Sequence, residues 1–329
     1  MLEVSLFTFK LLCLSSLKGV GQQSLNRLLN EDILKLDLEE ILKKVYLKKQ
    51  YSLEDIEQAR TFAQKQVDEA YKRGHYIISP LDNIYPEILK KLEVRPAILF
   101  IAGSLEAVNS KKVAVIGTRE PTTHGNIIAK RITTWFTQEG WGILSGLAIG
   151  IDTIAHQSTL DANGITIAVL AHGLDTVYPA KNRGLADEIL RSNGALVSEY
   201  PYGVTVRPAQ LVQRDKIQAA LSNAVVLVQS DLKGGSLHAS REAIKLGRHL
   251  VVAGQSTTDL ENNESKTQAN NFILTGSNDE IARFMRCLPN QLDRIIYLKN
   301  KNDYSFVNNI LLSVSEDVIQ NPKEQSLFD

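Results

Sequence analysis

The sequence has few cysteines and no long hydrophobic run, and each absence excludes a class of protein. Its 329 residues include two cysteines, Cys13 and Cys287, which fit neither a zinc-ligand spacing nor a disulfide framework. No apolar run approaches the roughly 20 residues of a transmembrane helix. The first residues, Met-Leu-Glu-Val, lack the basic region of a signal peptide. We therefore expect a cytoplasmic protein with reduced thiols, without a membrane segment, metal or cofactor.

A net charge is also lacking, because 37 Lys and Arg balance 37 Asp and Glu. This balance argues against a uniformly basic nucleic-acid-binding surface. Residues 111–256 nevertheless hold fifteen Lys and Arg against eleven Asp and Glu. The sequence thus predicts a modest basic surface within this region.

Two common nucleotide-binding motifs are missing, since neither Gly-x-Gly-x-x-Gly nor Gly-x-x-x-x-Gly-Lys-Ser/Thr occurs. What is present is a buried-strand pattern at 113–116 that leads into Gly117-Thr118-Arg119, and a second hydrophobic run that ends in the glycine-bearing segment 145–152. Open α/β sheets bind anionic ligands at the carboxyl ends of their strands. The two turns are predicted to converge on one phosphate site, and that phosphate can belong to a polymer.

Residues 1–73 are predicted to form a small all-helical domain, because Leu and Ile recur there at three- and four-residue spacing. Within it, residues 16–25 have the glycine pattern of a helix-hairpin-helix module, similar to the SAM-like class of small helical domains. Amides at the start of the second helix can then meet a DNA phosphate. The alternative is a turn between two packing helices.

From residue 74 the pattern becomes strands alternating with helices, which indicates an α/β fold with a Rossmann-like, doubly wound, mainly parallel sheet. We assign this domain to 74–285, interpret 255–271 as a loop, and leave 286–329 as a tail of uncertain structure. The expected strands are 75–78, 97–102, 113–116, 142–145, 166–170, 195–198, 224–228 and 249–252, and the expected helices are 125–139, 152–163, 182–192, 212–222 and 237–247.

Seven short motifs occur in a fixed order over about two hundred residues. They are 85–89 (Tyr-Pro-Glu-Ile-Leu), 117–119 (Gly-Thr-Arg), 145–152 (Ser-Gly-Leu-Ala-Ile-Gly-Ile-Asp), 178–185 (Tyr-Pro-Ala-Lys-Asn-Arg-Gly-Leu), 198–203 (Ser-Glu-Tyr-Pro-Tyr-Gly), 235–237 (Gly-Ser-Leu) and 271–273 (Asn-Phe-Ile). In this set the chain resembles the DNA-processing protein A family (DprA, also called Smf), single-stranded-DNA-binding proteins of bacterial natural transformation. The resemblance covers about residues 5 to 285.

The chain departs from the family at two places. Where the family usually has an arginine-flanked asparagine, this chain has Arg214-Asp215-Lys216. The extra carboxylate weakens a phosphate path unless a neighbouring cation neutralises it. Residues 286–329 also lack the pattern of the winged helix that many members carry. The sequence is typical of a divergent member.

The glycine turns supply the first group of expected phosphate contacts. Amides freed by glycine can approach phosphate oxygens, and the following helices add their positive ends. Arg119 offers a planar guanidinium to one phosphate, and the alternative is a salt bridge to Glu120 or Asp152. This group is Gly117, Thr118, Arg119, Ser145, Gly146 and Gly150.

A second group of expected contacts follows from the family motifs and the nearby cations. Asn182 can instead cap a helix, the cations can simply be solvated, and the tyrosines at 178, 200 and 202 either stack on bases or pack locally. The group is Lys181, Asn182, Arg183, Arg207, Arg214, Lys216, Gly235 and Ser236.

We do not expect an enzyme, because Asp152 and His156 lack a nucleophile and are best explained as a buried hydrogen-bonded pair. The resemblance implies a homodimer that binds single-stranded DNA, protects it and presents it to the RecA recombinase. Two alternatives remain: a nucleotide hydrolase like the phosphoribohydrolases, for which Glu242 is placed too far from its glycines, and a nucleotide-sensing protein. The segment 325–328 (Gln-Ser-Leu-Phe) resembles a shortened sliding-clamp motif, or it packs on the chain itself.

Overall fold

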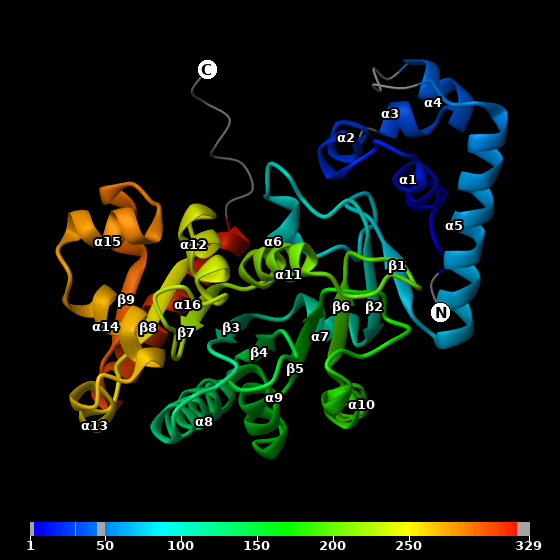
Figure 1. The fold of residues 1–329 in the computed structure, drawn as a ribbon. Helices are drawn as coiled ribbons and strands as arrows, with labels where there is room; N and C mark the ends of the chain where they lie inside the picture. Colours follow the sequence, from blue (N-terminus) through cyan, green and yellow to red (C-terminus); the bar gives the residue numbers. More distant parts are fainter. Residues whose placement is uncertain (1–2, 30, 45–49, 321–329) are drawn as a thin grey trace.

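The computed structural model describes residues 3–29, 31–44 and 50–320, and its centre is a nine-stranded sheet of order β1-β2-β6-β5-β4-β3-β7-β8-β9 (Figure 1). Strand β2 pairs antiparallel with β1 and β6, and the pairs from β6 to β9 are parallel. The strands are β1 (Tyr76–Ile78), β2 (Leu99–Gly103), β3 (Lys112–Ile116), β4 (Gly142–Ser145), β5 (Thr166–Leu170), β6 (Ala195–Ser198), β7 (Ala224–Leu227), β8 (His249–Ala253) and β9 (Ile295–Leu298). The doubly wound, mainly parallel α/β fold expected from the sequence is confirmed.

A small helical bundle precedes the sheet and lies beside β1 and β2 (Figure 1). Its apolar side chains share one cluster with Phe100 of β2, so the bundle and the sheet have a continuous core. No helix among the described residues is long and apolar enough to cross a membrane. The bundle consists of α1 (Leu6–Ser16), α2 (Gln22–Arg27), α3 (Glu31–Leu34), α4 (Leu38–Lys44) and α5 (Leu53–Arg73).

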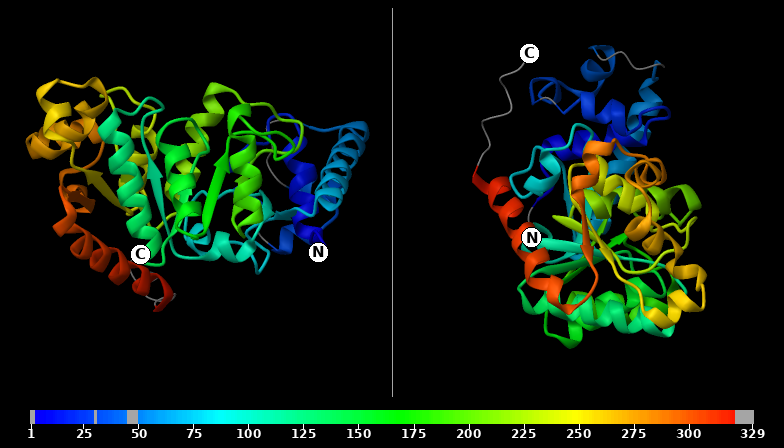
Figure 2. Two further views of the ribbon diagram at one scale, coloured as in Figure 1. Left: turned by 90° about the horizontal axis from the view of Figure 1, so that it is seen from below. Right: turned by 90° about the vertical axis from the view of Figure 1, so that its left-hand side faces the viewer.

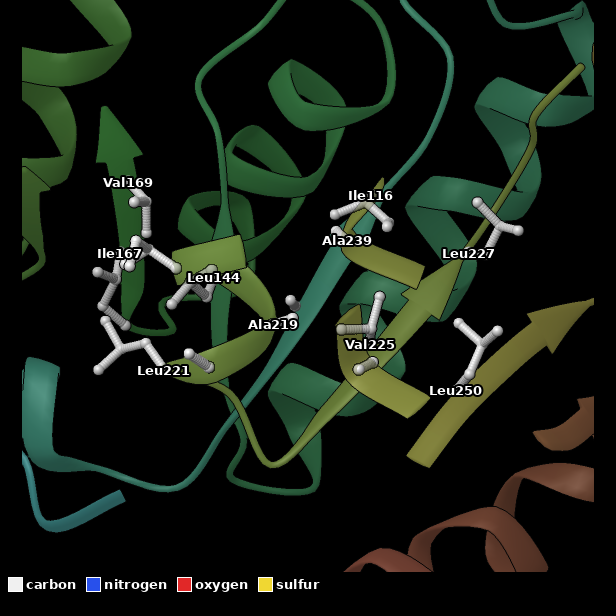
Figure 3. Packing of buried hydrophobic residues seen from close by; sticks show 14 of the residues in the cluster. Ile116, Leu144, Ile167, Val169, Ala219, Leu221, Val225, Leu227, Ala239 and Leu250 are labelled. Carbon is white, nitrogen blue, oxygen red and sulfur yellow. The ribbon is translucent and has the colours of Figure 1, made fainter. Parts of the chain in front are cut away.

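Helices cover both faces of the sheet because its strands are apolar on both sides. In β3, Val113 and Val115 pack on one face, whereas Ala114 and Ile116 pack on the other. One face carries α8 (Thr123–Gln138), α9 (Ile151–Asp161), α10 (Arg183–Arg191) and α16 (Tyr304–Gln320). The other carries α6 (Glu87–Lys90), α7 (Leu105–Asn109), α11 (Pro208–Ala220), α12 (Leu237–Lys245), α14 (Gln268–Thr275) and α15 (Asn278–Met285). Figure 3 shows this second core.

The segment 255–271, expected to be a loop, contains helices. Ser256 caps α13 (Thr257–Glu261), and α14 begins at Gln268. The side-chain amide of Asn270 donates to three backbone carbonyl groups, at Leu227, Val228 and Ala253. The prediction was wrong because these polar helices depend on tertiary contacts rather than on an apolar period of their own.

The sheet also extends beyond residue 285, the limit expected from the sequence. Strand β9 pairs in parallel with β8, and Val307 and Leu311 of α16 enter the core beside β3 and β7. The Trp141 indole donates to Asn308 at 2.7 Å, which ties α16 to the chain before β4. Figure 2 shows α16 on the half of the sheet that lies away from the helical bundle. Short 3₁₀ turns at Ala180–Asn182, Ser265–Thr267, Pro289–Arg294 and Lys301–Asp303 complete the described elements.

The order of the strands reverses next to β3. The chain passes from β3 through α8 to β4 on one side, whereas β7 flanks β3 on the other side. The loops after β3 and β7 therefore diverge at the carboxyl edge of the sheet. In open α/β sheets this switch point is where ligands bind.

Candidate nucleic-acid interface

A cleft of 530 Å³ opens at this switch point. Its walls come from the loop after β3, the first turns of α11, and the loop that joins β7 to α12. The two strand ends expected to converge do so here, because residues 117–120 border the cleft together with Ala148 and Asp152. Cations that line the cleft are Arg119, Arg214, Lys233 and Lys266.

Arg119 is the cation of the cleft most available to a ligand. It is exposed, and its guanidinium forms no hydrogen bond or ion pair within the described residues. The expected alternative partners are engaged elsewhere, since Asp152 accepts from the amides of Gly146 and Ala148, and Glu120 lies 3.6 Å from Lys266. Arg119 also borders a second hollow of 80 Å³ next to Tyr178.

Glycine is required at positions 117 and 150 for close packing of the two loops. A Cβ at Gly117 would lie 2.6 Å from Ile151 Cγ1, and one at Gly150, whose φ is +80°, would lie 2.5 Å from the Thr118 carbonyl oxygen. The Thr118 amide donates to Gln229 at 2.8 Å and is therefore not free for a phosphate. These residues shape the turn, and Arg119 is the group that the turn presents.

Ser145 and Gly146 have structural roles, contrary to the expectation of phosphate contact. Ser145 is fully buried and its hydroxyl donates to Val115 at 2.7 Å. The Gly146 amide donates to Asp152 at 3.1 Å, and a Cβ at this position would overlap the Arg214 guanidinium.

Arg214 was also expected to contact DNA, but the structure places it in the interior. It is 6% exposed and donates to the carbonyl groups of Gly146 and Val169, while its Nε pairs with Asp215 at 3.0 Å. Burial raises the pKa of Asp215 to about 6, and the nearby Arg214 acts in the opposite direction. The extra carboxylate is thus paired with its own neighbour, which weakens its effect on a phosphate without removing its charge.

Asn182 occupies the N-cap position of α10, which the sequence offered as an alternative, but its side chain forms no capping hydrogen bond. Its buried side-chain amide donates to Leu147 at 2.8 Å and to Thr153 at 2.9 Å, so it ties the start of α10 to the second glycine turn. Lys181 and Arg183 on either side are exposed and form no ion pair within the described chain. Asn182 positions this loop, and the two cations remain available.

The other expected contacts divide between exposed positions of α11 and the wall of the cleft. Arg207 and Lys216 are exposed at the start and on the outer side of α11. Gly235 and Ser236 line the cleft, and the Ser236 hydroxyl donates to Ser230 at 3.0 Å. Sequence reasoning missed Lys233, although it directly precedes a glycine pair, and Lys266, which had been placed in a loop.

A family profile covers most of the sheet. The profile of the family described as DNA recombination-mediator protein A matches residues 76–285, which include both glycine turns and every residue that lines the cleft. This chain belongs to that family. The helical bundle and strand β9 lie outside the matched region.

Similar proteins carry the names given to this family. The Protein Smf of Escherichia coli is 36% identical over 179 residues, covering 54% of this chain and 48% of that protein. The DNA processing protein DprA of Bacillus subtilis is 35% identical over 176 residues, covering 53% and 59%. The chain spans about half the length of these curated relatives.

Solved structures of the family have the same fold. DprA from Streptococcus pneumoniae superposes with a TM-score of 0.65 at 25% identity, covering 83% of this chain and 99% of that one. The protein from Helicobacter pylori superposes with a TM-score of 0.57 at 25% identity, covering 74% and 96%, and its structure is described as giving insight into a single-stranded DNA binding mode.

Contacts in the structure also bear on two further hypotheses from the sequence, the Asp152–His156 pair and the tyrosines as stacking platforms. His156 bonds to Thr166 at 2.6 Å rather than to Asp152, and burial lowers the pKa of His156 to about 3. Tyr202 is buried and bonds to His75 at 3.1 Å, so it offers no face to a base, whereas Tyr178 is 49% exposed. The predicted Asp-His hydrogen bond was therefore wrong, and of the two alternatives for Tyr202 the structure has local packing.

The glycine hairpin of the bundle packs against the α/β domain. The side-chain amides of Gln22 and Asn26 donate to the Arg95 carbonyl at 2.6 and 2.7 Å. Gly21 borders an interdomain cleft of 210 Å³ that also contains Phe100. These contacts favour a packing turn over a DNA contact. The clamp-like segment at 325–328 lies outside the described residues.

Proposed function

We propose that this chain binds single-stranded DNA along the carboxyl edge of its sheet, with Arg119 at the centre. The observation that carries the proposal is an exposed arginine that forms no hydrogen bond or ion pair with the described residues and is held by two interlocked glycine turns at the rim of a cleft. A guanidinium in this state is suited to a phosphate, which it can contact through two parallel hydrogen bonds. Family membership and the single-stranded DNA binding mode described for the H. pylori protein support the same ligand.

The proposed path of the DNA strand also includes four exposed cations outside the lining of the cleft. Lys181, Arg183, Arg207 and Lys216 are exposed and form no ion pair within the described chain, so each can neutralise a phosphate without first losing a partner. Tyr178 borders the hollow next to Arg119 and supplies one aromatic face for an unpaired base. Ser145, Gly146, Asn182 and Arg214 position these groups.

Single-stranded DNA is expected to bind more tightly than duplex of the same sequence. A cleft at the carboxyl edge of the sheet admits one sugar-phosphate backbone and leaves the bases of that strand free to stack. Fluorescence anisotropy with an oligo-dT and a matched dA·dT duplex measures the difference. Equal affinity for both forms would contradict the proposal. Binding of mononucleotides with no binding of DNA would instead establish the nucleotide-sensing alternative.

Arg119→Ala is expected to weaken binding of oligo-dT about tenfold and to lower the slope of log K against log salt by about one, since one phosphate contact is lost. Lys181→Ala should act in the same direction. Arg191→Ala is the matched control, because Arg191 is exposed in the last turn of α10, away from the cleft. If Arg119→Ala and Arg191→Ala give the same salt slope as the unaltered protein, Arg119 is not a phosphate contact.

Asp215→Asn tests the departure from the usual family residue. The folded-state pKa of about 6 means that Asp215 is charged at pH 7.5 and becomes protonated as the pH falls through 6. We therefore expect Asp215→Asn to strengthen binding about two- to fivefold at pH 7.5 and to have little effect at pH 5. An effect of equal size at both pH values would show that the carboxylate charge is not the cause.

The wider role is part of the same proposal. As the family resemblance of the motifs implies, the chain forms a homodimer, protects single-stranded DNA and presents it to RecA during DNA uptake or recombination. Light scattering at micromolar concentration measures the dimer, and RecA filament formation on protein-coated DNA measures the presentation. A monomer mass or an absence of stimulation would remove the corresponding part. The hydrolase alternative has little support, because Glu242 faces Lys245 at 3.7 Å instead of lining the cleft.

A further inference from the structure

A group of basic side chains extends away from the cleft across the outer surface of α12. His238 lies in the first turn of α12 and lines the cleft. Arg241 follows one helical turn later, and Arg286 directly follows α15, which packs against α12. Together with Lys216 of α11, we call these residues the α12 track.

The members of the α12 track are close enough to influence one another. The pKa of His238 is lowered first by desolvation and then by the charges of Arg241, Arg286 and Lys216. The pKa of Arg241 is likewise lowered by desolvation and by Arg286. The lowered pKa leaves His238 mostly neutral at pH 7, so the charge of the group is that of Lys216, Arg241 and Arg286. Like charges gathered around one side chain repel one another, and their arrangement favours an anionic occupant.

Contacts within the protein hold the track in place without neutralising it. The Arg241 guanidinium donates to the Phe284 carbonyl at 3.0 Å and lies 5.5 Å above the Phe284 ring. The nearby Glu242 is engaged by Lys245. Within the described residues, Lys216, His238, Arg241 and Arg286 form no ion pair with a carboxylate.

We propose that the α12 track binds the DNA strand where it leaves the cleft, so that a long strand is held at two places and a short strand at one. This inference rests on the proposed function and extends it. The occupant is a polyanion continuous with the strand in the cleft, because His238 belongs to both surfaces and connects them. The track contacts only the sugar-phosphate backbone of the DNA. It therefore adds affinity and salt dependence without a preference for DNA sequence.

The test compares two oligonucleotides, dT of about 6 and about 20 nucleotides, with the full chain. Arg286→Ala is expected to weaken binding of the longer oligonucleotide about three- to tenfold and to lower its salt slope by about one, with the shorter one unchanged. Arg286→Glu should enlarge the loss. Arg191→Ala serves as the matched control, and thermal melting verifies that each variant is folded.

Three results would overturn the proposal that the α12 track binds DNA. Arg286 variants could leave the longer oligonucleotide unaffected, or weaken both lengths equally, or alter the mass in light scattering without altering DNA affinity, which would identify a contact between subunits. Failure of the proposed function itself looks different, because the unaltered protein would then bind neither oligonucleotide.

Discussion

Arg214→Ala is expected to lower the free energy of unfolding by about 3–5 kcal/mol, the size of effect seen when one partner of a buried ion pair is removed. Arg214 joins β5 and the residue after β4 to α11 by donating to the Val169 and Gly146 carbonyl groups. Its removal would leave Asp215 buried without its counter-ion and the two carbonyl groups without this donor. Urea unfolding followed by circular dichroism measures the loss.

The pH dependence distinguishes this explanation from simple loss of packing. Burial already raises the pKa values of Asp152 and Asp215, and Arg214 is the strongest opposing influence on both. Without the arginine their folded-state pKa values rise further above the unfolded values, so the carboxyl groups destabilise the fold while charged and stop doing so once protonated. The loss in Arg214→Ala should be larger at pH 8 than at pH 5.

Two further variants serve as controls for Arg214. Lys216→Ala, on the exposed side of the same helix, should change stability by less than about 0.5 kcal/mol. Arg214→Lys keeps a charge but loses the planar fork, and it should recover only part of the stability. If the Arg214→Ala protein unfolds like the unaltered one and loses only DNA affinity, Arg214 contacts DNA and does not stabilise the fold.

The inward position of Arg214 could have been predicted from helical spacing. Ile217, Gln218 and Leu221 follow it at three, four and seven residues, and all are buried on the same side of α11. Its charge and its place in a family motif suggested a ligand contact instead. Arg119 is exposed directly after the first glycine turn, as a short apolar strand followed by glycine had indicated, and its contact with a phosphate stays a prediction.

Other features depend on partners that are distant in the sequence. Asn270 is buried because three strand-end carbonyl groups, from β7, β8 and the residue after β7, surround its amide. Strand β9 consists of only four residues. It belongs to the sheet because it pairs with β8, where Ile295 lies opposite Leu250, some 45 positions earlier in the sequence. A local pattern contains neither partner, so neither feature could be predicted from its own segment.

A buried lysine at the opposite edge of the sheet provides the last test. Lys112, the first residue of β3, is 1% exposed, and the charge acting on it is that of Arg248, another cation. Burial, with a smaller influence of Arg248, lowers the pKa of Lys112 to about 7. Its neutral form is therefore favoured in the folded state and its charged form in the unfolded state.

The consequence for stability follows from proton linkage. Between pH 7 and 10.5 the unfolded chain binds more protons at this position than the folded one, so stability should rise with pH over that window, and the full penalty is present below pH 7. Lys112→Met keeps a similar shape without an ionisable group. We expect it to raise the free energy of unfolding by about 1–4 kcal/mol at pH 7 and to flatten the rise between pH 7 and about 10. The exposed Lys130→Met is the control, and a Lys112→Met protein less stable than the original would mean that the amine has a stabilising partner.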